Sequence, residues 1–409
     1  MKRLSLITLA ALLTVAGLYA RTIENVTIDG RDRTYAIYEP TTYNNEVVFL
    51  LHGLGETYDD YDATAMQNFA NKNKCTVVMP QALSEQDATL LELLDMIKTF
   101  QPEMGDLKQA LEKSAWGANV YITIDDLCTA LGISKTYLEL FVKQYPQFKH
   151  FLDEDRIQIN KDVNDRNFIN NLIIFNRDNA KTKIHIVGCS LGGALAYDLG
   201  FNTPENITKI ASLSGFVSKG VEVPSSYKLP TLIIHSKTDQ IIPFDGGLYN
   251  RPIGALALDI ANKQGNRVPK ATILNEDQDA DKQIIMYDWE SDPHDRFYIV
   301  SKADHSLVED MAALGYNIYD VVGDFLFDQH VAANEATADS QSLDIYPNPV
   351  ESMANVNMEG NYSIINMAGV TVSTGYTEGV IDMSSISAGR YILVLTSSNE
   401  VYRRIIIKK

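Results

Sequence analysis

Serine, aspartate and histidine together can carry out nucleophilic acyl transfer, and in this chain one residue of each type follows a predicted strand, in that order. The pentapeptide GCSLG at 188–192 has the G-x-S-x-G spacing that places a nucleophilic serine on a sharp strand-to-helix turn. Glycines flank the serine because strand and helix pass too closely there for a Cβ atom. Apolar, β-favouring residues precede the pentapeptide, and a helix-compatible stretch follows it. The pattern therefore predicts that Ser190 is a nucleophile.

A serine hydroxyl needs a base that takes its proton, and the base needs an acid that orients it. On a sheet of this type the chain order is serine, acid, histidine, each after a strand. Asp239 follows the predicted strand 231–236, and His305 follows the predicted strand 296–302. We therefore predict Asp239 as the acid, with Asp245 as the alternative, and His305 as the base. Five other histidines stand before the serine or at unsuitable positions, namely His52, His150, His185, His294 and His330.

An oxyanion hole requires two backbone N–H groups aimed at the charge that develops on the substrate. One should be the amide of Leu191, directly after the nucleophile. The other should come from the loop LHGLG at 51–55, where glycines on either side would let the Leu54 amide face the site. A glycine turn that serves packing alone is the alternative interpretation of this loop.

The composition limits the classes of partner. A net charge of −18 with no basic cluster argues against nucleic acid, because phosphate backbones are bound by basic surfaces. No metal-ligand spacing occurs, so we expect neither a catalytic metal nor a cofactor. The acidic loop 275–281 lacks the turn glycine of an EF-hand, and we interpret it as a solvated loop rather than a calcium site.

The first twenty residues resemble an export signal. Lys2 and Arg3 precede an almost wholly apolar run from Leu4 to Leu18, which is too short for the roughly 20 residues of a membrane span. We therefore predict a signal peptide over 1–20 and a mature chain without a transmembrane segment. The three cysteines, Cys75, Cys128 and Cys189, leave open one disulfide or none. Cys189 should point away from Ser190 as a small buried residue.

The order of predicted elements indicates an α/β catalytic domain over 21–331, with a mostly parallel sheet and helices on both faces. Predicted strands cover 25–29, 33–38, 46–51, 76–79, 183–187, 208–213, 231–236 and 296–302, and predicted helices cover 59–72, 162–176, 191–201 and 317–329. Residues 84–160 do not fit this alternation. Apolar residues at helical spacing predict two or three helical elements there, which act as a lid over the site or merely extend one layer.

A small, polar stretch at 332–342 is typical of a linker. The following 343–409 contains β-type runs at 362–365, 370–374, 391–396 and 401–407, which predict a small all-β sandwich. A carbohydrate-binding β-domain is the alternative interpretation of this module.

With these residues identified, the catalytic part resembles the α/β-hydrolase fold, and more narrowly the polyhydroxybutyrate depolymerase and feruloyl esterase group. The resemblance rests on LHGLG at 51–55, DV and FI at 162–163 and 168–169, GCSLGG at 188–193, and HSKTDQIIPFDG at 235–246. It implies the same triad and the same two oxyanion amides as above. The stretch KADHSLV at 302–308 departs from that group, which has a glycine-rich approach to the histidine and a Trp-Pro pair after it.

The C-terminal module resembles the sorting domain of the type IX secretion system of Bacteroidota. The matching stretches are YPNP at 346–349, IDMSSISAGRYI at 381–392 and the basic end RRIIIKK at 403–409. The resemblance implies passage through the outer membrane, removal of the module, and release or surface attachment. The secretion machinery would then be a partner.

These observations lead to one interpretation with two alternatives. The chain is expected to be a secreted serine esterase that forms an acyl-enzyme on feruloyl or acetyl esters of polysaccharide, or on a polyester. One alternative is a serine peptidase on the same fold, although no further exopeptidase domain is evident. The other is a non-catalytic surface binding protein, against which the complete set of triad residues argues.

Overall fold

The computed structural model divides the chain into two compact units, and the boundary between them in the sequence lies between residues 330 and 331. It describes residues 21–409 with the exception of 100, 178–180, 267, 277, 290–292, 328–342, 344, 367–370 and 398–399. The predicted signal peptide at 1–20 and the predicted linker at 332–342 lie outside the described residues.

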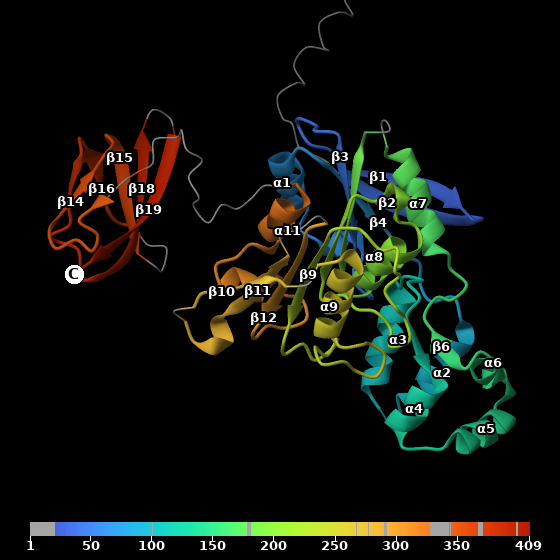
Figure 1. Ribbon diagram of the computed structural model, residues 1–409. Coiled ribbons are helices and arrows are strands. Elements are labelled where there is room, and N and C mark those ends of the chain that lie inside the picture. The colour runs from blue at the N-terminus through green and yellow to red at the C-terminus, as the bar shows by residue number, and fades with distance from the viewer. Residues whose placement is uncertain are drawn as a thin grey trace, which may run out of the picture. The chain divides into compact units, whose positions relative to one another are not determined.

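A ten-stranded sheet forms the centre of the first unit, in the order β1-β2-β4-β3-β7-β8-β9-β12-β11-β10 (Figure 1). The six strands from β4 to β12 are parallel, whereas both edges are antiparallel. A mostly parallel α/β sheet is thus confirmed. The strands are β1 (Thr22–Ile28), β2 (Arg31–Tyr38), β3 (Glu46–Leu51), β4 (Thr76–Pro80), β7 (Lys183–Cys189), β8 (Lys209–Leu213), β9 (Thr231–Ser236), β10 (Lys270–Leu274), β11 (Ile284–Trp289) and β12 (Asp295–Val300).

Helices cover both faces of this sheet, which explains why its central strands are apolar throughout. On one face lie α1 (Ala63–Asn73), α10 (Val308–Ala313) and α11 (Ile318–Leu326); on the other lie α7 (Asp165–Phe175), α8 (Leu191–Asn202) and α9 (Ile253–Gln264). Ten of the twelve residues of α8 are buried. The helix that begins after Ser190 is therefore part of the core, and its position is fixed by packing on all sides.

The edge beyond β9 is larger than the sequence predicts. The prediction has no element between 237 and 295, yet this region contains α9, β10 and β11. The antiparallel strands β11 and β10 extend the sheet past β12. In β10 no residue is fully buried, so the strand lacks the apolar run or clear alternation on which the prediction depended.

Residues 84–160 contain more elements than the two or three predicted. Five α-helices and one pair of short antiparallel strands occupy this insertion, and they gather at one end of the unit (Figure 1). Side-chain N-caps at Asp87, Thr123 and Ser134 start three of the helices. These elements are α2 (Ala88–Ile97), α3 (Glu103–Lys113), β5 (Tyr121–Thr123), α4 (Ile124–Leu131), α5 (Lys135–Gln144), α6 (Lys149–Asp153) and β6 (Arg156–Gln158).

The second unit consists of two small antiparallel sheets around one core, in agreement with the predicted all-β module. One sheet contains β13 (Ile345–Tyr346), β14 (Met353–Val356) and β17 (Val380–Asp382), and the other contains β15 (Gly360–Asn366), β16 (Thr371–Thr377), β18 (Gly389–Ser397) and β19 (Glu400–Lys408). Val350, Ile364, Leu393 and Leu395 are fully buried between them. Among the helices of the described ranges, none has the length and hydropathy that a membrane span requires.

Candidate active site

Ser190 lies on a strained turn between β7 and α8. Its φ of 51° and ψ of −117° are rare for a residue with a side chain. The flanking glycines are required by space: a Cβ atom on Gly188 would lie 2.1 Å from the carbonyl oxygen of Gly192, and one on Gly192 would lie 2.2 Å from that of Leu51. The Ser190 amide donates to the carbonyl of Leu213 at 2.9 Å, which ties the turn to β8.

The structure brings Ser190, His305 and Asp239 into one chain of hydrogen bonds. His305 Nε2 lies 2.8 Å from Ser190 Oγ, and His305 Nδ1 lies 2.7 Å from Asp239 Oδ2. Since a carboxylate only accepts, the ring proton is on Nδ1, and Nε2 is free to accept the serine proton. The alternative acid, Asp245, is exposed, and the carboxylate that contacts His305 is that of Asp239.

Asp239 is buried yet held as a carboxylate. Burial alone would raise its pKa, but His305 and the amides of Ile241 and Ile242 lower the pKa below its ordinary value. Both amides donate to Asp239 Oδ1, at 2.8 and 2.9 Å. A second histidine, His235, lies 3.5 Å from Oδ2. Its Nε2 donates to the carbonyl of Ile242 at 2.9 Å, and burial lowers its pKa, so it supports the turn as a neutral ring.

Two serines that the sequence prediction missed hold the loop of His305. Ser214, the residue after β8, donates from its hydroxyl to the carbonyl of His305 at 2.6 Å. Ser236, the last residue of β9, donates to the carbonyl of Ala303 at 2.7 Å. A polar residue at the end of an otherwise apolar parallel strand was the available signal, because these strand ends meet at the edge that carries the site.

The loop after β3 lies beside the nucleophile. A Cβ atom on Gly53 would be 3.4 Å from the Cβ of Ser190. Glu56 Oε2 accepts from the amide of Gly53 at 2.7 Å and from the hydroxyl of Tyr61 at 2.9 Å. Gly55 has a φ of +73°, so the chain reverses directly after Leu54. Because the Gly53 amide already donates to Glu56, the next amide in the loop, that of Leu54, is the candidate oxyanion donor.

Leu191 and His52 complete the surroundings of the nucleophile. Leu191 is the first residue of α8, so its amide has no acceptor within the helix. His52 is fully buried, and its Nε2 accepts from the amide of Ala82 at 3.1 Å. Its Nδ1 must then carry the proton that it donates to the carbonyl of Gly53 at 2.8 Å. Burial lowers the pKa of His52 to about 4, which keeps the ring neutral.

The three cysteines are free thiols. Cys189 packs with the residues on the α1 and α11 face, whereas Leu191 packs on the opposite face. Burial raises the pKa of Cys189 to about 12, so the thiol beside the candidate nucleophile stays protonated. Within the ranges that the structure describes, no cluster of His, Cys, Asp and Glu has a metal-binding arrangement.

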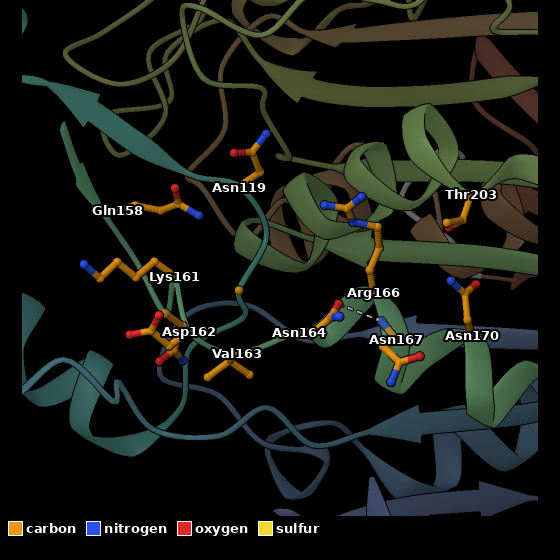
Figure 2. Close-up of a pocket in the computed structure, with 12 residues that line it drawn as sticks. Asn119, Gln158, Lys161, Asp162, Val163, Asn164, Arg166, Asn167, Asn170 and Thr203 are labelled. Atoms are coloured by element: carbon orange, nitrogen blue, oxygen red, sulfur yellow. Dashed lines mark hydrogen bonds between the residues drawn. The ribbon is translucent and has the colours of Figure 1, made fainter. Parts of the chain in front are cut away.

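A polar cavity of about 530 Å³ lies apart from these residues, between the insertion and α7 (Figure 2). Amide side chains dominate its lining, with Asn119 and Gln158 on the insertion side and Asn164, Asn167 and Asn170 on the other. None of the predicted site residues belongs to this lining. The cavity is therefore separate from the candidate active site.

Comparisons with known proteins identify both units. Residues 150–252 match the phospholipase/carboxylesterase family, and residues 344–409 match the secretion system C-terminal sorting domain. The first match contains Ser190 and Asp239. The first unit is thus an α/β-hydrolase and a carboxylic ester hydrolase, and the second is a type IX sorting domain. Comparison with curated proteins gives no significant match.

Several solved structures are similar at low identity. A CIB-like hydrolase from Thermoplasma acidophilum is 13% identical with a TM-score of 0.39, over 76% of this chain and 99% of that one. An acetyl xylan esterase from Aspergillus awamori is 12% identical with a TM-score of 0.42, over 72% and 99%. A dienelactone hydrolase from Anabaena variabilis is 12% identical with a TM-score of 0.38, over 76% and 97%.

Proposed function

We propose that this carboxylic ester hydrolase acts through a catalytic triad of Ser190, His305 and Asp239. The observation that carries the proposal is the pair of hydrogen bonds, 2.8 Å from Ser190 Oγ to His305 Nε2 and 2.7 Å from His305 Nδ1 to Asp239 Oδ2. This is the geometry in which a histidine can take the serine proton while an acid fixes its tautomer.

Each step then follows from the position of a group. Ser190 Oγ attacks the ester carbonyl while His305 Nε2 takes its proton, and a tetrahedral oxyanion forms. The amides of Leu54 and Leu191 bind this oxyanion. When the intermediate collapses, His305 returns the proton to the departing alcohol, and an acyl-serine remains. Water, deprotonated by His305, releases the acid and restores Ser190.

The negative charge on Asp239 stabilises the protonated imidazole of His305 in a partly buried site. Its lowered pKa keeps it ionised at neutral pH, so the positive charge on His305 is balanced during both acylation and deacylation. The amides of Ile241 and Ile242 hold the carboxylate on its other oxygen. The acid therefore keeps its orientation while His305 gains and loses a proton.

The proposed substrates are feruloyl or acetyl esters of polysaccharide, or a polyester. The resemblance of the stretches at 51–55, 188–193 and 235–246 supports this choice, and secretion supports an extracellular polymer. We also propose that the signal peptide at 1–20 directs export and that 343–409 is removed after passage through the outer membrane.

Turnover of p-nitrophenyl acetate and of a peptidyl-nitroanilide separates an esterase from a peptidase, with Ser190→Ala as the control. We expect ester turnover that the substitution abolishes. Amide turnover alone would favour the peptidase, and no turnover of either would favour a binding protein. Methyl ferulate, acetylated xylan and hydroxybutyrate oligomers then identify the acyl and alcohol groups.

A further inference from the structure

The segment that follows α3 in the insertion is buried against the loop that carries Leu54. Ser114 and Trp116 are fully buried. The indole Nε1 of Trp116 donates to the carbonyl of His52 at 2.8 Å. The Gly55 amide donates to the carbonyl of Ser114 at 2.8 Å, and the Ser114 hydroxyl donates to the carbonyl of Glu56. These bonds hold the loop on both sides of Leu54.

The orientation of the Leu54 amide is set by two successive peptide planes. The plane between His52 and Gly53 is held at its carbonyl by Trp116 and at its N–H by Glu56. In the next plane, the Gly53 carbonyl accepts from His52 Nδ1, and the Leu54 N–H lies at the other end. Because a peptide unit is planar, fixing its carbonyl also fixes the direction of its N–H.

The same contact sets the distance to the second candidate donor. A Cβ atom on Gly192 would lie 2.6 Å from the carbonyl oxygen of His52, so this oxygen lies against the first turn of α8. Trp116 therefore holds a carbonyl that touches the helix of Leu191 on one side and leads to Leu54 on the other. A shift of this carbonyl would change the spacing between the two oxyanion donors.

The supporting segment is itself firmly anchored. The Ala115 amide donates to the carbonyl of Leu83 at 2.6 Å, and Asn160 donates to the carbonyl of Ala115 at 2.6 Å. The Gly117 amide donates to Asp165, which forms a fully buried ion pair with Arg33. A segment with this much buried hydrogen bonding belongs to the stable part of a fold rather than to a lid that opens.

We propose that Ser114 and Trp116 are positioning residues, and that this part of the insertion builds the oxyanion hole instead of covering the site as a lid. The inference rests on the proposed function, because it concerns the alignment of the Leu54 and Leu191 amides for the same reaction. It adds to that function by giving the insertion a catalytic consequence, although none of its described residues takes part in the hydrogen bonds of the triad.

The test compares Trp116→Phe and Ser114→Ala with Trp289→Phe. Trp289 is a matched control because it is also buried, and its indole nitrogen has no hydrogen-bond partner among the residues that the structure describes. The readouts are kcat and KM for p-nitrophenyl acetate, the affinity for phenylboronic acid, which forms a tetrahedral adduct with an active serine, and the pH profile of kcat/KM.

For Trp116→Phe we expect kcat to fall about 10- to 100-fold, because loss of a whole oxyanion donor costs about 10²–10³. KM should change less than about twofold, and boronate affinity should fall with kcat. The pH profile should keep its shape, since His305 and Asp239 are untouched. Ser114→Ala should act in the same direction and serves the test alone if Trp116→Phe does not fold.

A kcat for Trp116→Phe and Ser114→Ala that equals that of Trp289→Phe would overturn the inference. So would a change in KM alone, which is what the loss of a lid or substrate wall produces. Failure of the proposed function looks different: the unaltered protein would neither turn over the ester nor bind the boronate.

Discussion

At the scale of single residues, the site depends on glycines whose lack of a Cβ atom lets neighbouring groups approach closely. Gly188 and Gly192 each leave room for backbone atoms, and Gly53 leaves room for the carboxylate of Glu56. These requirements are encoded locally, which is why the pentapeptide at 188–192 predicts both the turn and its nucleophile. The pairing of the acid with the base is not encoded locally, since Asp239 and His305 lie 66 positions apart in the chain.

Replacement of Gly192 by alanine tests the close approach of α8 to β3. The added Cβ would lie 2.2 Å from the carbonyl oxygen of Leu51, so the helix must shift away from the loop that carries Leu54. We expect a loss of about 1–3 kcal/mol in unfolding free energy and a larger loss of esterase activity. Gly105→Ala is the control, because the nearest described atoms to its Cβ would be those of the flexible Lys98 side chain, at 3.9 Å. Equal stability losses for both variants would show that the close approach at Gly192 is not required.

Replacement of Asp239 by asparagine tests the role of the acid. The amide can no longer balance an imidazolium or enforce the Nδ1 proton of His305, and we expect kcat to fall about 10⁴-fold with the fold retained. Asp245→Asn, in the alternative acid of the same loop, should keep its activity. Kinetics on p-nitrophenyl acetate and circular dichroism of both variants measure this, and the reverse pattern would reassign the acid.

At the scale of elements, the parallel strands that end at the site could be predicted from the sequence, because buried central strands are continuous apolar runs. Helix α8 could be predicted as well. The antiparallel strand β10 could not, since this edge strand is only partly buried and shows no clean pattern. Its neighbour β11 is interior to the sheet, but its sequence IIMYDW shows no clear alternation either. The predicted number of helices in the insertion was also wrong. The capping residues Asp87, Thr123 and Ser134 divide the insertion into shorter helices than apolar spacing alone indicates.

The support of the Leu54 loop lay beyond sequence reasoning. Trp116 contacts His52 across 64 positions, and nothing in the type or spacing of either residue indicates that they meet. Such a contact arises because apolar residues of the insertion share one core with Leu51 of β3 and Val78 of β4. Tertiary contacts of this kind are set by shape rather than by local pattern.

The buried ion pair between Arg33 and Asp165 joins β2, α7 and the insertion. Both side chains are almost fully buried, and Asp165 also accepts from the Gly117 amide at 2.7 Å. Asp165→Asn would leave Arg33 buried without its counter-charge, which costs about 3–5 kcal/mol. We expect a corresponding loss in urea denaturation, together with weaker esterase activity as the insertion loosens. Lys135→Gln, in an exposed ion pair of the insertion, should change stability by less than about 1 kcal/mol.

At the scale of the whole molecule, the stability of the first unit should depend on pH through its buried histidines. Burial lowers the pKa values of His52, His185 and His235. The unfolded chain therefore binds more protons than the folded one below about pH 6.5, and the folded state loses stability as the pH falls. Asp295 acts in the opposite direction, because burial raises its pKa to about 6.

The contribution of one histidine can be isolated by difference. Burial lowers the pKa of His52 to about 4. Its contribution to the unfolding free energy is therefore about 3 kcal/mol, which is present above pH 6.5 and is lost as the pH falls toward 4. Unfolding free energies of the unaltered protein and of His52→Gln, measured in urea at pH 7 and pH 4.5, should differ less at the lower pH. A difference independent of pH would show that His52 is not held neutral.

The central claim is that Ser190 carries the acyl group, and mass spectrometry of the protein quenched during turnover of p-nitrophenyl acetate tests it most directly. We expect one acetyl group on the peptide that contains Ser190, and we expect Ser190→Ala to lack both this group and the ester turnover. An acetyl group on another residue, or full turnover by Ser190→Ala, would contradict it.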